Sequence, residues 1–225
     1  MVSHAVEHGN NPIVTYFDTR KAFDTLWIEG LFYQLYHKGI TGKLWRVLRM
    51  TYQGCVSSVL VCGGLTPWYD LVLGVKQGAL YSMLFYVCFI NDLLLDLNNL
   101  SLGIDMMGIK CCAIGYADDI AVFAMHQPIM QRLIHKASAY SRRWRFSFSP
   151  SKCAYLIYSE TPQARTKRMD SGNRGLYIDD EVLEEKSEYT HVGIVNRASN
   201  VTPVNWISIG YADHVAVFAQ FSGSD

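Results

Sequence analysis

The segment IGYADDIAVFA at positions 114–124 constrains the fold more than any other, because it places two adjacent aspartates inside an apolar, strand-like run. Isoleucine, valine, phenylalanine and tyrosine favour strands. An ionised carboxylate in the middle of a buried strand would be costly unless it were paired. A tight turn between two strands avoids that cost by holding Asp118 and Asp119 at the tip of a hairpin. The sequence therefore predicts a β-hairpin that carries both carboxylates.

A third carboxylate, Asp18, ends the short β-branched and aromatic run NPIVTYFD at 11–18, which predicts a strand. If the hairpin lies beside this strand, Asp18, Asp118 and Asp119 converge. Three neighbouring anions repel one another unless cations bind, and carboxylate oxygens are natural ligands of Mg²⁺. The alternative is a pair of surface turns with ordinary aspartates, which would suffice for either motif alone.

The rest of the chain alternates helix and strand patterns. Apolar residues at helical spacing, followed by glycines that end the segment, predict helices. Runs rich in β-branched and aromatic residues between turn residues predict strands, and one polar, charged stretch predicts a loop. The predicted helices cover 27–36, 41–52, 80–97 and a segment that starts at Pro128; the strands cover 153–158, 188–195 and a hairpin in 56–74 turning at Gly63-Gly64; the predicted loop is 159–175. This mixture predicts an α+β fold, an antiparallel sheet with helices on one face.

Composition narrows the class further. The chain has 225 residues, half of them hydrophobic, with twenty basic and twenty acidic side chains. A net charge of zero lacks the positive excess of most nucleic-acid-binding domains, although a local basic strip remains compatible with it. Six cysteines without zinc spacing indicate reduced core cysteines of an intracellular protein, in the nucleus or the cytoplasm. The apolar run 80–97 is interrupted by Asn91, Asp92 and Asp96, which predicts a buried helix and no membrane span.

Four ordered motifs carry a resemblance to a known family. They are FDTRKAFDTLWIEGLF, GVKQGALYSMLFYVCFINDLL, IGYADDIAVFA and SPSKCAYLIY, and the resemblance that they carry runs from about position 10 to 195. In this order they resemble the palm motifs of reverse transcriptases, and the wording is most similar to the non-LTR (LINE-type) retrotransposon enzymes. The resemblance implies a reverse-transcriptase-like palm that adds deoxynucleotides (dNTPs) to a DNA primer on an RNA template.

The resemblance also implies roles for single residues. Asp18 and Asp118 match the aspartates that hold two Mg²⁺ ions, with Mn²⁺ as an alternative, and Asp119 matches a less constant contributor. Lys152 in SPSKC matches a lysine that protonates or neutralises departing pyrophosphate; the alternative is a solvated surface lysine.

Further positions match the family's nucleotide and primer contacts. Phe23 matches the steric gate against a ribose 2′-hydroxyl, or is simply a core residue. Gln77 and Gly78 match the pair beneath the incoming nucleotide and template base. The segment YTHVGI at 189–194, with His191 and Gly193, resembles the primer grip. The basic side chains Arg142, Arg143 and Arg145 contact phosphate or form a solvated helix face.

Departures from the family pattern set limits on this reading. QGALYS lacks the family's usual proline, and the chain starts just before the first aspartate motif, so fingers and thumb are expected to be largely missing. Residues 1–195 are read as a partial palm domain and 196–225 as a tail. The tail repeats the hairpin as IGYADHVAVFA at 209–219, with His214 in place of the second aspartate; it is a duplicated fragment or, alternatively, an element that mimics the site.

Two classes of function follow from these observations. The first is a reverse transcriptase fragment of a retrotransposon. The second is a catalytically inactive remnant with at most weak nucleic-acid binding, or a structural RNA-binding palm. Because positioning of primer and nucleotide supplies much of the rate, the isolated chain is expected not to extend a primer. The oligomeric state stays open.

Overall fold

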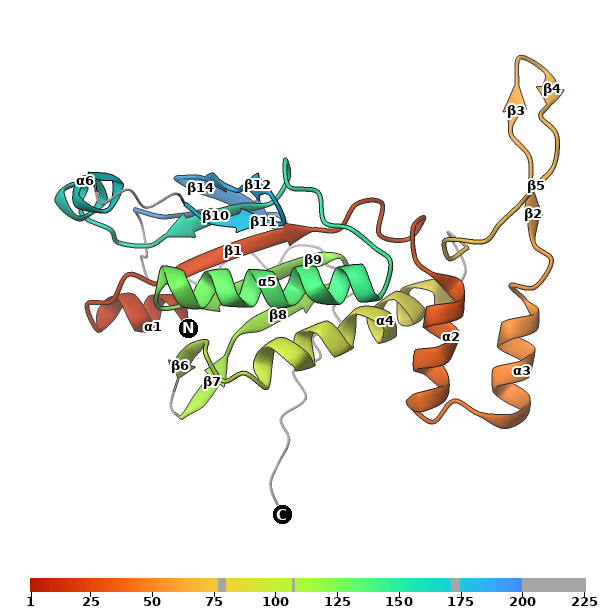
Figure 1. Cartoon of the computed structure of the whole chain (residues 1–225), viewed down its shortest axis with the longest axis horizontal. Coiled ribbons are helices and arrows are strands. Elements are labelled where there is room, and N and C mark those ends of the chain that lie inside the picture. The colour runs from red at the N-terminus through yellow and green to blue at the C-terminus, as the bar shows by residue number, and fades with distance from the viewer. Residues whose placement is uncertain (77–79, 107, 171–174, 200–225) are drawn as a thin grey trace. The chain divides into compact units, whose positions relative to one another are not determined.

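The computed structural model describes residues 1–76, 80–106, 108–170 and 175–199 (Figure 1). Gln77, Gly78 and the tail repeat with His214 lie outside the described residues. The chain divides into two compact units. The first, which we call the sheet unit, comprises Met1–Thr19, Leu93–Ser141 and Ser147–Asp225; the second, the helical unit, comprises Arg20–Asp92 and Arg142–Phe146.

The sheet unit is built around a five-stranded sheet in the order β13-β10-β1-β9-β8. Its strands are β1 (Ile13–Asp18), β8 (Ala113–Tyr116), β9 (Asp119–Ala124), β10 (Ala154–Ile157) and β13 (Glu184–Glu185). The central strand β1 is antiparallel to β9 and to β10, and only the short β13 runs parallel to its neighbour. The predicted antiparallel sheet of an α+β fold is confirmed.

Both faces of this sheet are covered, which explains why β1 and β9 are buried at almost every position. The helix α5 (Gln127–Arg143) runs along the sheet in Figure 1, and its buried residues recur at helical spacing. On the face that carries Val14 and Tyr16, the short helix α1 (Val2–Glu7) packs through Val2 and Val6. The prediction of helices on one face was therefore incomplete, because α1 has no periodic apolar stripe long enough to show in the sequence.

Smaller elements surround the sheet. They are the hairpins β6 (Ile104–Met106) with β7 (Ile109–Cys111), β11 (Tyr177–Ile178) with β12 (Glu181–Val182), and β14 (Glu188–His191) with β15 (Ile194–Arg197), and the helix α6 (Pro162–Asp170).

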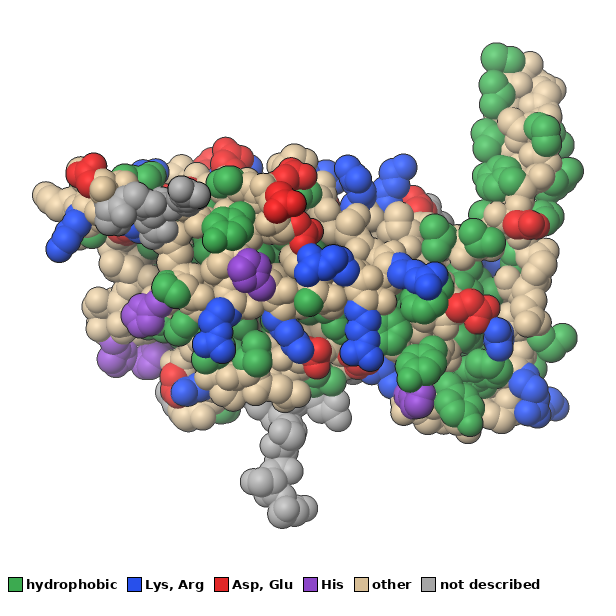
Figure 2. Space-filling view, in the orientation of Figure 1, with side chains coloured by type: hydrophobic (Ala, Val, Ile, Leu, Met, Phe, Trp, Pro, Cys, Tyr) green, Lys and Arg blue, Asp and Glu red, His purple; other side chains and the backbone are tan. Residues whose placement is uncertain are grey.

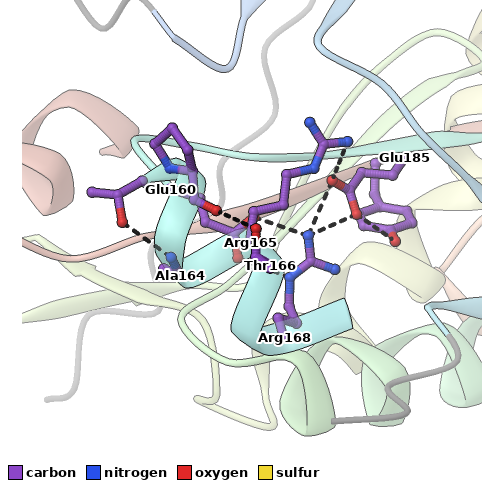
Figure 3. A network of polar contacts seen from close by, with 9 residues as sticks. Glu160, Ala164, Arg165, Thr166, Arg168 and Glu185 are labelled. Atoms are coloured by element: carbon purple, nitrogen blue, oxygen red, sulfur yellow. Dashed lines mark hydrogen bonds and ion pairs between the residues drawn. The ribbon is translucent and has the colours of Figure 1, made fainter. Parts of the chain in front are cut away.

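The predicted loop at 159–175 is wrong, because α6 occupies most of its described part. The guanidinium of Arg168 donates to both carboxylate oxygens of Glu160 at 2.8 and 2.9 Å, and also to Glu185 at 2.9 Å (Figure 3). Glu185 lies in β13 and also accepts from the hydroxyl of Tyr155 at 3.1 Å. These ion pairs stabilise α6. The helix could not be predicted from its own sequence, because the sequence is polar and has no apolar stripe.

The helical unit contains α2 (Ile28–His37), α3 (Gly42–Met50) and most of α4 (Leu80–Asn98), which confirms the three predicted helices. Between α3 and α4 lies a long hairpin formed by β2 (Val56–Ser57), β3 (Leu60–Val61), β4 (Gly64–Leu65) and β5 (Tyr69–Asp70). Its tip is Cys62-Gly63, one residue before the predicted turn, with positive φ at both positions as in type I′ turns. Figure 2 shows hydrophobic side chains along this hairpin.

The helix α4 was predicted to be buried, and Phe85, Phe89, Leu93 and Leu97 on it are buried. In residues 1–76, 80–106, 108–170 and 175–199, no helix combines the length and the apolar content that crossing a bilayer requires.

Candidate active site

Two of the predicted carboxylates face each other across neighbouring strands. Asp18 is the last residue of β1 and Asp119 is the first residue of β9, and the antiparallel register pairs them directly. Directly opposed side chains of an antiparallel pair lie about 5 Å apart at Cβ, so like charges there destabilise the sheet. The register thus places two acidic groups together at one end of the central strands.

Asp118 occupies the turn that joins β8 to β9. Tyr116 pairs with Asp119, so the connection is the two-residue loop Ala117-Asp118. The predicted hairpin is confirmed, but only Asp118 lies in its turn, because Asp119 is already the first residue of β9. Ala117 has a φ of 52°, a left-handed conformation that glycine usually adopts in this kind of turn. A non-glycine residue in that conformation costs about 1 to 2 kcal/mol. The turn is therefore held in a strained geometry that fixes Asp118 beside the paired strands.

The three carboxylates influence one another electrostatically. Burial raises the pKa of Asp119, and the negative charges of Asp118 and Asp18 raise it further, while His191 acts in the opposite direction. Within the described part of the chain, no three acidic, histidine or cysteine side chains already surround a common metal position. The arrangement is a set of neighbouring carboxylates at one end of β1 and β9 and in the adjoining turn. Its all-oxygen donors fit Mg²⁺, which needs only one or two carboxylates besides water and phosphate.

Lys152 reaches this end of β1 through a turn at the start of β10. The backbone N–H of Ser149 donates to the carbonyl of Asp18 at 2.9 Å, and the N–H of Lys152 donates to the carbonyl of Ser149 at 2.9 Å. The Lys152 Nζ lies 3.6 Å from an Asp18 carboxylate oxygen, although its side chain is 68% exposed. A pair this solvated contributes below about 1 kcal/mol, so the ammonium is available to a second anion.

Sequence reasoning missed Cys153 as a neighbour of the site. The backbone N–H of Asp18 donates to the Cys153 Sγ at 3.4 Å. Burial raises the pKa of this thiol to about 11, so it is neutral and acts as a backbone partner and not as a ligand. The sequence feature that could have indicated this contact is the position of Cys153 directly after Lys152 and directly before β10.

The predicted primer-grip segment packs against the face of β1 that carries Tyr16. The Tyr189 ring stacks on Tyr16 with 4.5 Å between centroids, and the His191 ring lies 4.9 Å from Tyr16. The Tyr189 hydroxyl donates to the Lys152 carbonyl at 3.1 Å. Burial lowers the pKa of His191, and the charge of Asp119 partly opposes this shift. The strand β14 therefore links the lysine turn to the carboxylates, a role for Tyr189 that the sequence did not reveal.

The turn from β14 to β15 is Val192-Gly193, with φ of 51° and 72°. Glycine suits this type I′ geometry, whereas a β-branched valine in it is strained.

Phe23 belongs to the helical unit, where its half-buried ring lies 5.1 Å from the ring of Tyr86. The structure thus brings together Asp18, Asp118, Asp119, Lys152 and His191 in the sheet unit. Arg142, Arg143 and Arg145 lie in the helical unit.

Comparisons with known proteins identify the family of this chain. Residues 2–207 match the family model described as reverse transcriptase (RNA-dependent DNA polymerase), and the chain belongs to this family. It is 23% identical over 186 residues to the RNA-directed DNA polymerase from the mobile element jockey of Drosophila funebris. That match covers 80% of this chain and 19% of the relative, so the chain spans about a fifth of the relative's length.

Solved structures show the same fold. Telomerase from Candida albicans, in complex with a TWJ fragment of telomeric RNA, has a TM-score of 0.59 at 13% identity, covering 87% of this chain and 31% of that one. Apo telomerase from Candida tropicalis, truncated from its C-terminal domain, has a TM-score of 0.57 at 10% identity, covering 87% and 36%. The predicted reverse-transcriptase palm of LINE type is confirmed by the family match and the jockey relative. Members of this family generally use divalent metal ions.

Proposed function

We propose that this chain forms the palm of an RNA-directed DNA polymerase of a LINE-type retrotransposon, which adds dNTPs to a DNA primer on an RNA template. The observation that carries the proposal is the pairing of Asp18 with Asp119 across β1 and β9, with Asp118 in the adjoining turn. The family match and the name of the jockey relative support the same reaction.

Asp18 and Asp118 hold the divalent ions in this proposal, and Asp119 contributes to the same site. When bound, two Mg²⁺ ions activate the primer 3′-hydroxyl and stabilise the leaving pyrophosphate. The aspartates orient these ions. Burial is the main cause of the raised pKa of Asp119, and the negative charges of Asp118 and Asp18 add to it, so a bound cation would relieve both effects.

The remaining residues position the substrates. The exposed ammonium of Lys152 neutralises the charge of the pyrophosphate or gives it a proton. Phe23 acts as the steric gate toward the sugar, and Gln77 and Gly78 support the nucleotide and template base. The β14–β15 hairpin, with His191 and Gly193, holds the primer terminus.

Metal binding tests the site separately from catalysis. Mn²⁺ binding is followed by electron paramagnetic resonance, and Mg²⁺ by the shift in thermal unfolding that ligand linkage predicts. Asp18→Asn and Asp118→Asn are expected to abolish both signals. Asp180→Asn, an exposed aspartate in the turn between β11 and β12, is the matched control and is expected to bind normally.

Primer extension on an RNA template then separates the two classes of function. Extension that Asp118→Asn abolishes supports a polymerase. Metal binding without extension supports the alternative of an inactive remnant, and binding that ignores Asp18 and Asp118 contradicts the proposed site.

A further inference from the structure

The two units carry opposite charges although the whole chain is neutral. The helical unit has ten Lys and Arg against four Asp and Glu, a net charge of +6. The sheet unit has ten basic and sixteen acidic residues, a net charge of −6. A unit with this positive excess attracts polyanions, and its field is concentrated wherever the chain also forms a concave surface.

The helical unit has such a surface over α2 and α3. A groove of about 680 Å³ is lined there mainly by aromatic side chains. We call it the aromatic groove; the lining residues used below are Trp27, Tyr33, Tyr36, Trp45, Arg143 and Trp144. All of them belong to the helical unit. Its volume falls within the range of about 300 to 1,000 Å³ that is typical of ligand sites.

Two tyrosine rings of the groove are exposed, and its three tryptophans are half-buried. Tyr33 is 59% exposed and Tyr36 is 53% exposed, although both project from a helix whose opposite side is buried. Figure 2 shows hydrophobic and basic side chains together with a histidine over α2 and α3. Exposed, clustered aromatic rings on a soluble domain mark an interaction site more often than a solvated surface.

A guanidinium lies close to the ring of each tryptophan of the groove. Arg49 is 5.0 Å from the centroid of Trp45, and Arg143 is 5.8 Å from that of Trp144. The guanidinium of Arg145 is 4.2 Å from the centroid of Trp27. One of these cations is partly neutralised, because Arg49 also pairs with Glu29 at 2.8 Å. The groove therefore combines flat aromatic surfaces with the positive charges of Arg49 and Arg143, while Arg145 lies outside its lining and Glu29 belongs to it.

We propose that the aromatic groove binds single-stranded RNA, by stacking bases on its rings and contacting phosphates through its arginines. Aromatic platforms with interleaved cations suit unpaired strands, because every base offers a π-face while the backbone is anionic. A proline-rich peptide also docks in aromatic grooves, but its backbone carries no negative charge that the net charge of +6 on the helical unit would attract. The choice of RNA over DNA rests on the proposed function; the groove itself involves none of the carboxylates of the sheet unit.

Intrinsic fluorescence provides a readout confined to the groove. The chain has five tryptophans, and in the double variant Trp68→Phe/Trp206→Phe the three that remain all line the groove. An unlabelled oligouridine of about ten nucleotides is expected to quench their emission. Anisotropy of the same oligonucleotide carrying fluorescein gives the affinity of the full chain.

Removal of two rings tests the stacking. Tyr33→Ala/Tyr36→Ala is expected to weaken oligouridine binding by about tenfold or more, and Tyr33→Phe/Tyr36→Phe to restore it to within about twofold. Tyr69→Ala, which removes an exposed ring of β5 outside the groove, is the matched control and is expected to bind as the parent chain does. Arg143→Gln is expected to reduce the slope of log affinity against log salt by about 0.7. Circular dichroism confirms that each variant is folded.

The proposal is overturned if the double alanine variant binds as tightly as the parent, or if oligouridine leaves the tryptophan emission unchanged. Quenching by decaproline but not by oligouridine identifies a peptide groove instead, and tighter binding of oligothymidine overturns the choice of RNA. Asp118→Asn is expected to leave the quenching intact. A failed polymerase and a failed groove are thus distinguishable.

Discussion

The two units of this chain differ in the sign of their net charge and in the charged side chains that they bring together. In the sheet unit, antiparallel pairing forces Asp18 and Asp119 together in a unit that is already acidic. In the helical unit, arginines lie over tryptophan rings in a unit that is basic. In our two proposals, the first arrangement binds metal cations and the second binds a polyanion. A net charge of zero therefore says nothing about binding when the charges segregate by unit, and each unit has to be judged separately.

The largest expected effect separates the two units by activity. With metal and template present, Asp118→Asn is expected to lower nucleotide incorporation by about a thousandfold or more, because the ions supply several kcal/mol of stabilisation to the transition state. Tyr69→Ala in the helical unit is expected to leave the rate unchanged. Single-nucleotide incorporation under excess enzyme measures both, provided that the parent chain is active; equal rates for Asp118→Asn and parent would contradict the proposed role.

The next effect compares packing in the two units. Leu156 is fully buried in β10, and Leu156→Ala is expected to lower the free energy of unfolding by about 3 kcal/mol through lost burial and a cavity. Leu60 on strand β3 is 69% exposed, so Leu60→Ala is expected to change the free energy of unfolding by less than about 0.5 kcal/mol. Urea denaturation measures both. A large loss at Leu60 would mean that another surface covers the hairpin.

A third test concerns the edge of the sheet unit. Arg168→Ala is expected to cost about 2 kcal/mol, because it leaves Glu160 and Glu185 with little solvent and no shared cation. Arg165→Ala removes an exposed arginine from the same Glu185 and is expected to cost less than about 0.5 kcal/mol. Thermal unfolding and proteolysis near α6 report the difference. Equal losses would show that the buried network adds nothing beyond a surface pair.

The smallest expected effect is a pH dependence. The folded-state pKa of Asp119 is raised above its unfolded value, so the folded form keeps its proton longer and stability falls as pH rises through that window. Asp119→Asn is therefore expected to stabilise the metal-free chain by up to about 1 kcal/mol near neutral pH. The gain should vanish in acid, below the unfolded pKa of the carboxyl. Urea titrations across pH measure it, and a gain that grows toward acid would contradict the assignment.

Local sequence chemistry was sufficient for much of the site. The run ending at Asp18 and the hairpin carrying Asp118 and Asp119 were predictable, because alternation and turn chemistry act over a few residues. The helix α6 was not predictable, since its stabilising partner Glu185 lies in a different element, far along the chain. Likewise, Tyr189 gave no sign in the sequence that it would stack on Tyr16.

The amino-acid sequence by itself determined the order of the motifs, the strand and hairpin that carry the aspartates, and through them the family. Only the tertiary structure decided that β1 lies between β9 and β10, which brings the Lys152 turn to Asp18. It also decided that Trp144 joins Trp27 and Trp45 in one groove, and that charge divides between two units. The physical reason is range: turns and periodicity depend on neighbouring residues, whereas strand order and charge segregation depend on contacts between residues far apart in the chain.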